Sequence, residues 1–219
     1  MTVARPTWLD ELVAQVETTP AHYYSRFLPP EEGAGRRAGV LVLVGPRDED
    51  PDDHDILLTE RAHGMRTHAG QVAFPGGSVD PEDRDVIDAA LREAHEEVGL
   101  DRTSVDVLAT LPELYMPHRD FGITPVVGWW RDPHPLTAGD PREVASVLRA
   151  PVSELVDPAN RFTVTHPNGY RGPAFEVDEQ DHVEDDWAHA CSAPHALGKF
   201  RDASRPTARQ DPRGPATWR

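Results

Sequence analysis

The sequence predicts a mixed α/β domain, and three features carry this prediction. A near-continuous apolar run at 38–44 has the length and composition of a buried strand. The segment 84–98 places apolar residues at helical spacing, which predicts a helix with one face against a core. Further short apolar runs surround these two segments, so strands and helices are expected to share one core.

The remaining elements follow in order along the chain. Apolar residues at helical spacing predict a helix at 7–18, which Pro20 ends. The helix at 84–98 is expected to bury the stripe Ile87, Leu91, Ala94 and Val98. Gly99 follows it and suits a left-handed C-terminal cap. Strands are expected at 56–61, 71–74, 105–111, 123–130, 143–148, 162–165 and 174–177, with a helical turn at 151–156.

Composition divides the chain into three parts. Residues 178–219 are crowded with Asp, Glu, His, Arg and Pro, and their large apolar residues are widely scattered. Such a segment buries too little apolar surface to offset the entropy of ordering it. We therefore expect an N-terminal helix and linker at 1–34, a globular domain at 35–177 and a mostly disordered tail at 178–219.

The charge balance of the 219-residue chain limits its partners. With 22 basic and 38 acidic residues, the formal net charge is -16, which argues against binding nucleic acid or anionic membranes. A phosphorylated small molecule remains compatible, because a bound metal ion can invert the local field. The single cysteine, Cys191, excludes an internal disulfide. With no secretory signal and no apolar run of the ~20 residues that span a membrane, we expect a cytoplasmic protein.

Three carboxylates on the second helix are the main chemical feature. Glu93, Glu96 and Glu97 are spaced so that they lie on one helix face, where like charges destabilise by ~0.2–0.5 kcal/mol per pair. Mg²⁺ or Mn²⁺, which prefer oxygen ligands, would relieve this repulsion. The alternative is a solvated acidic surface, which is the commoner outcome for three carboxylates alone. Gly76 and Gly77 precede the helix and let backbone approach a ligand closely.

The surrounding residues favour the metal-binding interpretation, because 76–100 resembles the Nudix box. That motif has Gly, five residues, Glu, seven residues, then Arg-Glu, an aliphatic, any residue, Glu-Glu, any residue, Gly and an aliphatic. Residues 92–100 match its second half throughout, counting Ala94 as the aliphatic. The first half departs: Asp83 replaces the Glu, and eight residues separate it from Arg92.

The resemblance implies a Nudix α/β/α sandwich with a mixed curved β-sheet, in which the box forms a loop-helix-loop. It also implies an enzyme, with Glu93 and Glu97 as primary ligands of Mg²⁺ or Mn²⁺ and Glu96 as a further ligand or the base that activates water. Arg92 would support catalysis structurally by ion-pairing with a loop carboxylate such as Asp83. The implied reaction is in-line attack of activated water on one phosphorus of a diphosphate.

A second motif lies upstream of the box. Residues 57–62 (LLTERA), Arg66, Gly70 and 74–77 (FPGG) are similar to the signature of coenzyme A pyrophosphatases. The extra residue in the box loop is expected of the same branch. The resemblance therefore implies hydrolysis of coenzyme A or its derivatives to adenosine 3′,5′-bisphosphate and 4′-phosphopantetheine.

Basic residues of this motif are candidates for binding the substrate phosphates. Arg61 and Arg66 can each bind phosphate through two parallel hydrogen bonds, and His68 could add a donor. Gly76 and Gly77 are expected to contact the same substrate. The bland alternatives are surface ion pairs for the arginines and a polar loop residue for the histidine.

Several alternatives stay open. The substrate could be another nucleoside diphosphate derivative, such as ADP-ribose, a dinucleotide or an oxidised nucleotide, or the domain could bind a ligand without turnover. Glu143 is a candidate further carboxylate, although an ordinary strand-edge position is the commoner explanation. Relatives usually end in an amphipathic helix, which 178–219 does not resemble, so a homodimer is left in doubt.

Overall fold

The computed structural model describes residues 4–25, 27–48, 50, 52–65, 70–165 and 171–175. Two of the predicted substrate-binding residues, Arg66 and His68, lie outside these ranges, as does the predicted tail at 178–219. Among the described helices, none has both the length and the apolar character required to cross a membrane.

One eight-stranded mixed sheet forms the centre of the domain. Its main path runs β3-β2-β1-β7-β5, with β4, β6 and β8 paired to β1, β7 and β2. Strands β1 and β7 run parallel, and the other described pairs of this sheet are antiparallel. The strands are β1 Arg36–Pro46, β2 His54–Arg61, β3 Val72–Ala73, β4 Gly76–Ser78, β5 Val105–Thr110, β6 Leu114–Met116, β7 Phe121–Trp130 and β8 Val144–Pro151.

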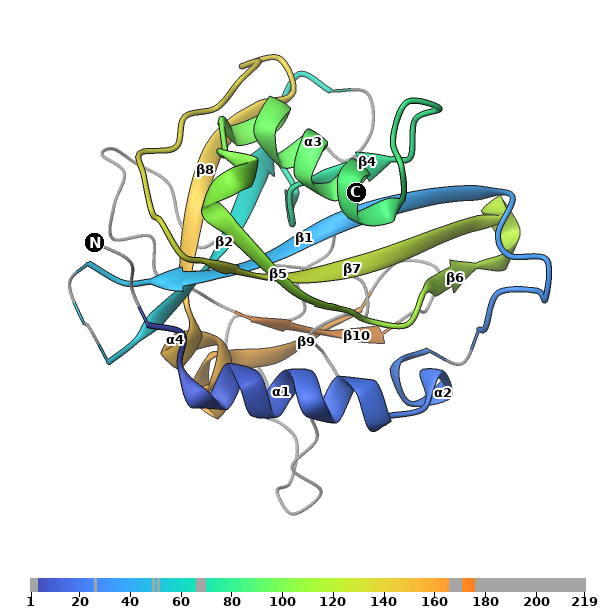
Figure 1. Cartoon of the computed structure of the whole chain (residues 1–219), viewed down its shortest axis with the longest axis horizontal. Helices are drawn as coiled ribbons and strands as arrows, with labels where there is room; N and C mark the ends of the chain where they lie inside the picture. Colours follow the sequence, from blue (N-terminus) through green and yellow to red (C-terminus); the bar gives the residue numbers. More distant parts are fainter. Residues whose placement is uncertain are drawn as a thin grey trace.

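Helices lie on both faces of this sheet (Figure 1). The α-helices are α1 Thr7–Thr18, α2 Ala21–Tyr24, α3 Val86–Val98 and α4 Val152–Val156. Short 3-10 turns occupy η1 Arg102–Ser104, η2 Pro117–Arg119 and η3 Pro158–Asn160, and a two-stranded sheet pairs β9 Arg161–Thr165 with β10 Arg171–Phe175. The arrangement of α3, sheet and α1 confirms the predicted α/β/α sandwich.

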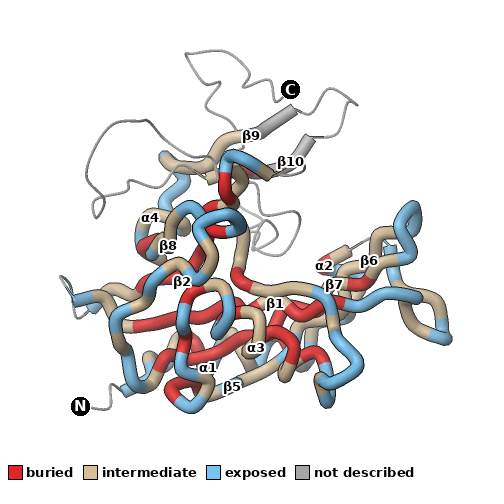
Figure 2. The backbone as a smooth tube through the Cα atoms, turned by 90° about the horizontal axis from the view of Figure 1, so that it is seen from above, coloured by how far each residue is buried: buried red, intermediate tan, exposed pale blue. Residues whose placement is uncertain are grey.

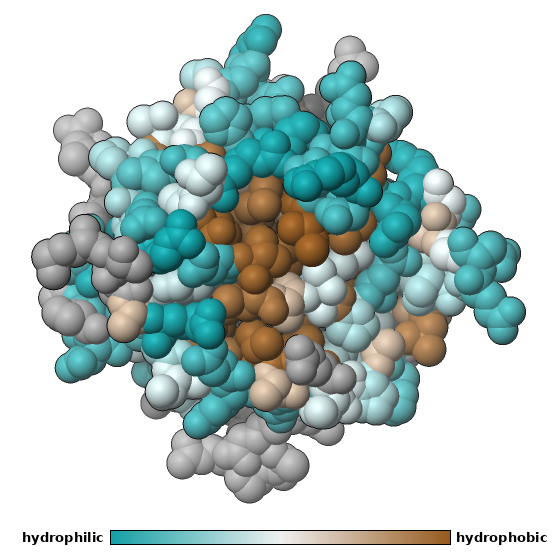
Figure 3. Space-filling model, viewed as in Figure 1, coloured by the Kyte–Doolittle hydropathy of each residue, from teal (hydrophilic) through white to brown (hydrophobic). Residues whose placement is uncertain are grey.

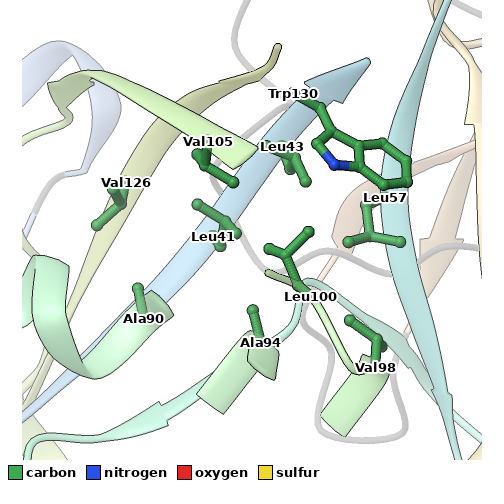
Figure 4. Close-up of a cluster of buried hydrophobic side chains, with 10 residues drawn as sticks. All are labelled: Leu41, Leu43, Leu57, Ala90, Ala94, Val98, Leu100, Val105, Val126 and Trp130. Atoms are coloured by element: carbon green, nitrogen blue, oxygen red, sulfur yellow. The ribbon is translucent and has the colours of Figure 1, made fainter. Parts of the chain in front are cut away.

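Alternation along the strands separates two apolar clusters. Leu41 and Leu43 of β1 pack toward α3, where Ala90, Ala94 and Val98 are buried against them (Figure 4). The neighbouring residues of β1 and β7 point to the other face and pack with α1. Most residues of β1, β2 and β7 are accordingly buried, while many residues of the connecting loops are exposed (Figure 2). In the view of Figure 1, an apolar area lies over the edge strand β5, between α3 and α1 (Figure 3).

Helix α3 is defined by its two ends. The carboxylate of Asp85 accepts hydrogen bonds from the backbone N–H groups of Ile87 and Asp88, both at 2.9 Å, so the helix begins at Val86 rather than at the predicted 84. Gly99 ends it in the left-handed conformation, with φ of 70°, which confirms the predicted cap.

The buried face of α3 differs in part from the predicted stripe. Ala94 and Val98 are fully buried as expected, but Ile87 and Leu91 are only partly buried. Their place is taken by two alanines, at 89 and 90. The reason is close packing: a Cβ on Gly39 of β1 would lie 2.1 Å from the Val86 carbonyl oxygen. Small residues on both elements bring this helix near the sheet.

The other predicted elements are present, most of them with shifted ends. Helix α1 has the predicted bounds, while β8 extends beyond the predicted 148 to Pro151, and β10 covers 171–175 in place of 174–177. Helix α2 and the short strands β4 and β6 were not predicted. Strands β4 and β6 are three residues long and depend on pairing with β1 and β7.

Candidate functional site

The candidate site lies where α3 passes the glycine-containing strand β4. Three carboxylates project from the last two turns of α3, but their surroundings differ. The Glu96 side chain is 56% exposed and that of Glu93 is 22% exposed. Glu97 is more enclosed, and burial is the largest influence on its pKa.

Arg92 connects the helix to the loop before it. Its Nε and Nη2 donate to the two carboxylate oxygens of Asp83, each at 3.0 Å. Its Nη1 lies 3.0 Å from Glu93 Oε1 and 3.2 Å from Glu96 Oε2, and Nη2 also donates to the Ser78 carbonyl at 3.1 Å. The predicted pairing of Arg92 with Asp83 is therefore confirmed. The guanidinium also lies between the carboxylates of Glu93 and Glu96, a contact that the sequence did not predict.

Asp83 performs its part despite being shorter than the Glu of the motif. Its side chain is 3% exposed, and the Asp80 backbone N–H donates to it at 2.8 Å. The hydrogen bonds from Arg92 hold the pKa of Asp83 below its ordinary value, and the same contact raises the pKa of Arg92. Both groups are charged, so the loop is tied to α3 by a charge-assisted pair.

The two glycines of β4 lie against the helix carboxylates. A Cβ on Gly77 would lie 2.4 Å from Glu93 Cδ. Gly76 has φ of 152°, and its N–H donates to Glu97 Oε2 at 3.0 Å. A side chain at Gly77 would displace Glu93, so its absence lets the carboxylate approach the strand. The predicted contact of both glycines with substrate stays a prediction.

The surroundings of Glu97 disfavour its charged form. Burial raises its pKa from 4.5 to about 7, against the lowering effects of the Gly76 hydrogen bond and of Arg61. Glu93 and Glu143 raise it further by repulsion. Within the described part of the chain, the Glu97 carboxylate forms no ion pair within 4.0 Å. A half-buried carboxylate in this setting favours either a proton or a cation.

Arg61 is the last residue of β2. Its Nη2 donates to Met65 Sδ at 3.2 Å, and its buried Nε makes no hydrogen bond within the described residues. Its charge lowers the pKa of Glu97. One of the three predicted phosphate-binding side chains thus acts on Glu97 through its charge, while the other two, Arg66 and His68, fall outside the described ranges.

The predicted metal ligands do not converge in this structure. Among the described residues, no group of three or more His, Cys, Asp or Glu side chains is arranged to hold a metal ion. Glu93 and Glu96 turn toward Arg92, and Glu97 turns toward Gly76. The donor set still fits Mg²⁺ or Mn²⁺, because all three side chains offer oxygen and Glu97 forms no ion pair with any described residue.

Sequence reasoning missed one contributor to this site. Gly139, in the loop between β7 and β8, donates its N–H to the Glu97 carbonyl at 2.9 Å. The loop sequence, with Gly139 next to Asp140 and Pro141, signalled a turn but gave no hint of the helix that it contacts.

The fold and site define an α/β/α protein whose acidic helix follows a glycine-containing strand. The model of the NUDIX domain matches residues 35–170, more than half of the 219 residues. The chain therefore belongs to the Nudix domain family.

Relatives carry the same family name. The chain is 47% identical over 121 residues to the uncharacterized Nudix hydrolase NudL of Cronobacter sakazakii, covering 55% of this chain and 60% of that protein. It is 38% identical over 153 residues to NudL of Yersinia enterocolitica, covering 67% and 75%. The match to the first relative thus spans less than two thirds of its length. The Nudix hydrolase RenU of M. smegmatis is similar with a TM-score of 0.44 and 25% identity, over 56% of this chain and 76% of that one.

Proposed function

We propose that this chain hydrolyses the pyrophosphate linkage of a nucleoside diphosphate derivative with the help of Mg²⁺ or Mn²⁺. The observation that carries the proposal is Glu97, a half-buried carboxylate that forms no ion pair in the described structure and is repelled by Glu93 and Glu143. A divalent cation would relieve this repulsion. Family membership supports the proposal, since the relatives are named as hydrolases.

Glu93, Glu96 and Glu97 would hold the metal through their carboxylate oxygens. When bound, the cation supplies charge neutralisation for the phosphates and lowers the pKa of a water molecule. With a cation bound, Glu93 and Glu96 would turn from Arg92 toward the metal, whereas Arg92 would keep its two hydrogen bonds to Asp83. The loop would therefore stay attached to α3 when the metal binds.

Glu96 is the best candidate for the proton acceptor. Its carboxylate is 56% exposed and can reach solvent without rearranging the core. Its only described ion pair is with Arg92 at 3.2 Å, on the helix surface. Because exposed ion pairs contribute only ~0–1 kcal/mol, separating Glu96 from Arg92 costs little free energy.

Coenzyme A or an acyl derivative is the proposed substrate. The support is the upstream motif, whose Arg61 acts on Glu97 through its charge and has a buried Nε that makes no hydrogen bond within the described residues. A phosphate oxygen would satisfy that donor. Arg66 and His68 of the same motif are proposed to bind further phosphate, including the 3′-phosphate.

The test is a product assay with matched variants. Purified protein is incubated with coenzyme A and Mg²⁺ or Mn²⁺, with and without chelator, and the products are separated by chromatography. The proposal expects metal-dependent release of adenosine 3′,5′-bisphosphate, lost in Glu97→Gln. Glu11→Gln removes an exposed carboxylate from α1 and is expected to retain full activity.

Other substrates separate the two levels of the proposal. Turnover of ADP-ribose or a dinucleotide in place of coenzyme A would overturn the substrate assignment and keep the reaction class. A folded protein that binds these compounds yet hydrolyses none of them would overturn the enzymatic function and leave a ligand-binding module.

A further inference from the structure

The loop between β7 and β8 covers the C-terminal end of α3. The last carbonyl groups of a helix have no partner within it and need donors from elsewhere. Here the Thr137 N–H donates to the Val98 carbonyl at 3.1 Å, and the Gly139 N–H donates to the Glu97 carbonyl at 2.9 Å. Two backbone groups of one loop thus hold the helix turn that carries Glu96 and Glu97.

Gly139 lies directly against the backbone of the last turn of α3. A Cβ there would lie 2.0 Å from the Glu96 carbonyl oxygen and 3.2 Å from its carbonyl carbon. These are backbone atoms, so they cannot rotate away as the end of a side chain could. Any residue with a Cβ would have to separate the loop from the last turn of α3, or shift that turn.

The same loop continues to the other side of the candidate site. The Asp140 carbonyl accepts from the N–H groups of Glu143 and Val144, each at 2.9 Å, and its carboxylate accepts from the Arg142 N–H at 2.9 Å. The Glu143 carbonyl in turn accepts from the Ala62 N–H at 2.9 Å.

These bonds join three separate parts of the chain that surround one carboxylate. Glu97 lies on α3, Arg61 is the residue before Ala62 at the end of β2, and Glu143 precedes β8. The charges of Arg61 and Glu143 both act on Glu97. The loop from Thr137 to Glu143 therefore spans the elements whose relative position determines the charge environment of Glu97.

We infer that Gly139 is a positioning residue, which sets the place of the Glu96–Glu97 turn against Arg61 and Glu143 and so the affinity of the site for a divalent cation. The inference rests on the proposed metal-dependent function. It assigns no contact with substrate or metal to Gly139. A loop that merely capped the helix would affect stability and leave cation affinity unchanged.

Two variants with matched controls test the inference. Gly139→Ala introduces the backbone conflict, and Gly64→Ala is its control, because a Cβ at Gly64 would meet no atom of the described residues within 4 Å. Asp140→Ala loosens the loop without touching the helix, since among the described residues its carboxylate bonds only to Arg142. Asp157→Ala is its control, because Asp157 likewise accepts from the N–H two residues on, at the start of η3.

Cation affinity is the deciding measurement. Free Mn²⁺ is titrated with each full-length protein and followed by electron paramagnetic resonance, while thermal unfolding in chelator reports folding without metal. Loss of an outer support of a metal site lowers affinity by roughly 10- to 100-fold, which is the result expected for Gly139→Ala. Asp140→Ala is expected to lower affinity in the same direction, and both controls should match the wild type.

Each outcome decides the inference. Wild-type Mn²⁺ affinity in folded Gly139→Ala and in Asp140→Ala overturns it; if Gly139→Ala fails to fold, Asp140→Ala decides alone. Wild-type protein that binds Mn²⁺ but turns over no substrate overturns the proposed function while the affinities still test the inference. Wild-type protein that binds no Mn²⁺ overturns both.

Discussion

Glu97 exerts opposite effects on metal-free stability and on metal binding, and Glu97→Gln separates them. Burial raises its pKa in the folded protein from 4.5 to about 7. The folded protein therefore holds this proton more tightly than the unfolded chain does. The stability that the proton contributes is fully present below about 4.5 and is lost as the pH rises through about 7.

The size of the effect follows from the same two values. One pKa unit corresponds to about 1.4 kcal/mol, so a rise from 4.5 to about 7 amounts to about 3 kcal/mol of unfolding free energy. Gln is neutral like the protonated acid, and its carbonyl oxygen can still accept from the Gly76 N–H. Glu97→Gln is thus expected to exceed the wild type by up to about 3 kcal/mol at pH 8 and by less than about 1 kcal/mol at pH 5.

Urea unfolding in chelator, followed by tryptophan fluorescence at both pH values, measures this difference. Equal stability at pH 8, or a difference that does not change with pH, would refute the conclusion that burial dominates around Glu97. Glu11→Gln, at an exposed carboxylate, should show neither effect. Adding Mn²⁺ at about 100 times its dissociation constant should then stabilise the wild type by about 2.7 kcal/mol and leave Glu97→Gln unchanged.

Three further substitutions test the geometry of the site. Gly77→Ala should displace the carboxylate of Glu93, whose Cδ lies 2.4 Å from the added Cβ, and weaken Mn²⁺ binding in calorimetric titration. Its urea midpoint should stay near that of the wild type, because the flexible Glu93 side chain can move. Undiminished Mn²⁺ affinity would contradict the predicted displacement of Glu93. Asp83→Asn should lower the unfolding free energy by about 2 kcal/mol in urea, because it removes the charged partner of Arg92, and an unchanged value would show that the pair is dispensable. Gly99→Ala should lower it by about 1 kcal/mol through strain at φ of 70°, and a rise in melting temperature would argue against that strain.

Local signals explain which parts of this structure the sequence predicts. Helix α1 and the C-terminal end of α3 are encoded by short-range features, namely apolar spacing, Pro20 and Gly99. The pairing of Arg92 with Asp83 was also predictable, since both belong to one motif and lie nine residues apart. In these cases the groups that determine the structure are close in sequence.

Other features depend on contacts between distant segments. Strand β4 has two glycines among its three residues and forms because β1 offers a partner edge, which no local propensity reports. Gly39 and Gly139 bring strand and loop against α3, but a glycine in sequence does not show which backbone it approaches. The burial of Glu97 follows from these same contacts, so its raised pKa could not be predicted from the carboxylate pattern.

The position of Arg92 reduces the charge repulsion on the acidic face of α3. Glu93 and Glu96 repel one another, yet one guanidinium lies between them and is itself anchored by Asp83. Arg92 therefore neutralises Glu93 and Glu96, the more exposed part of the carboxylate face. Glu97 has no such partner among the described residues, and burial favours its protonated form. A cation that reaches Glu97 must displace that proton and compete with Arg92 for Glu93. Cation affinity should consequently fall as the pH drops below about 7, while the loop held by Asp83 keeps its position throughout.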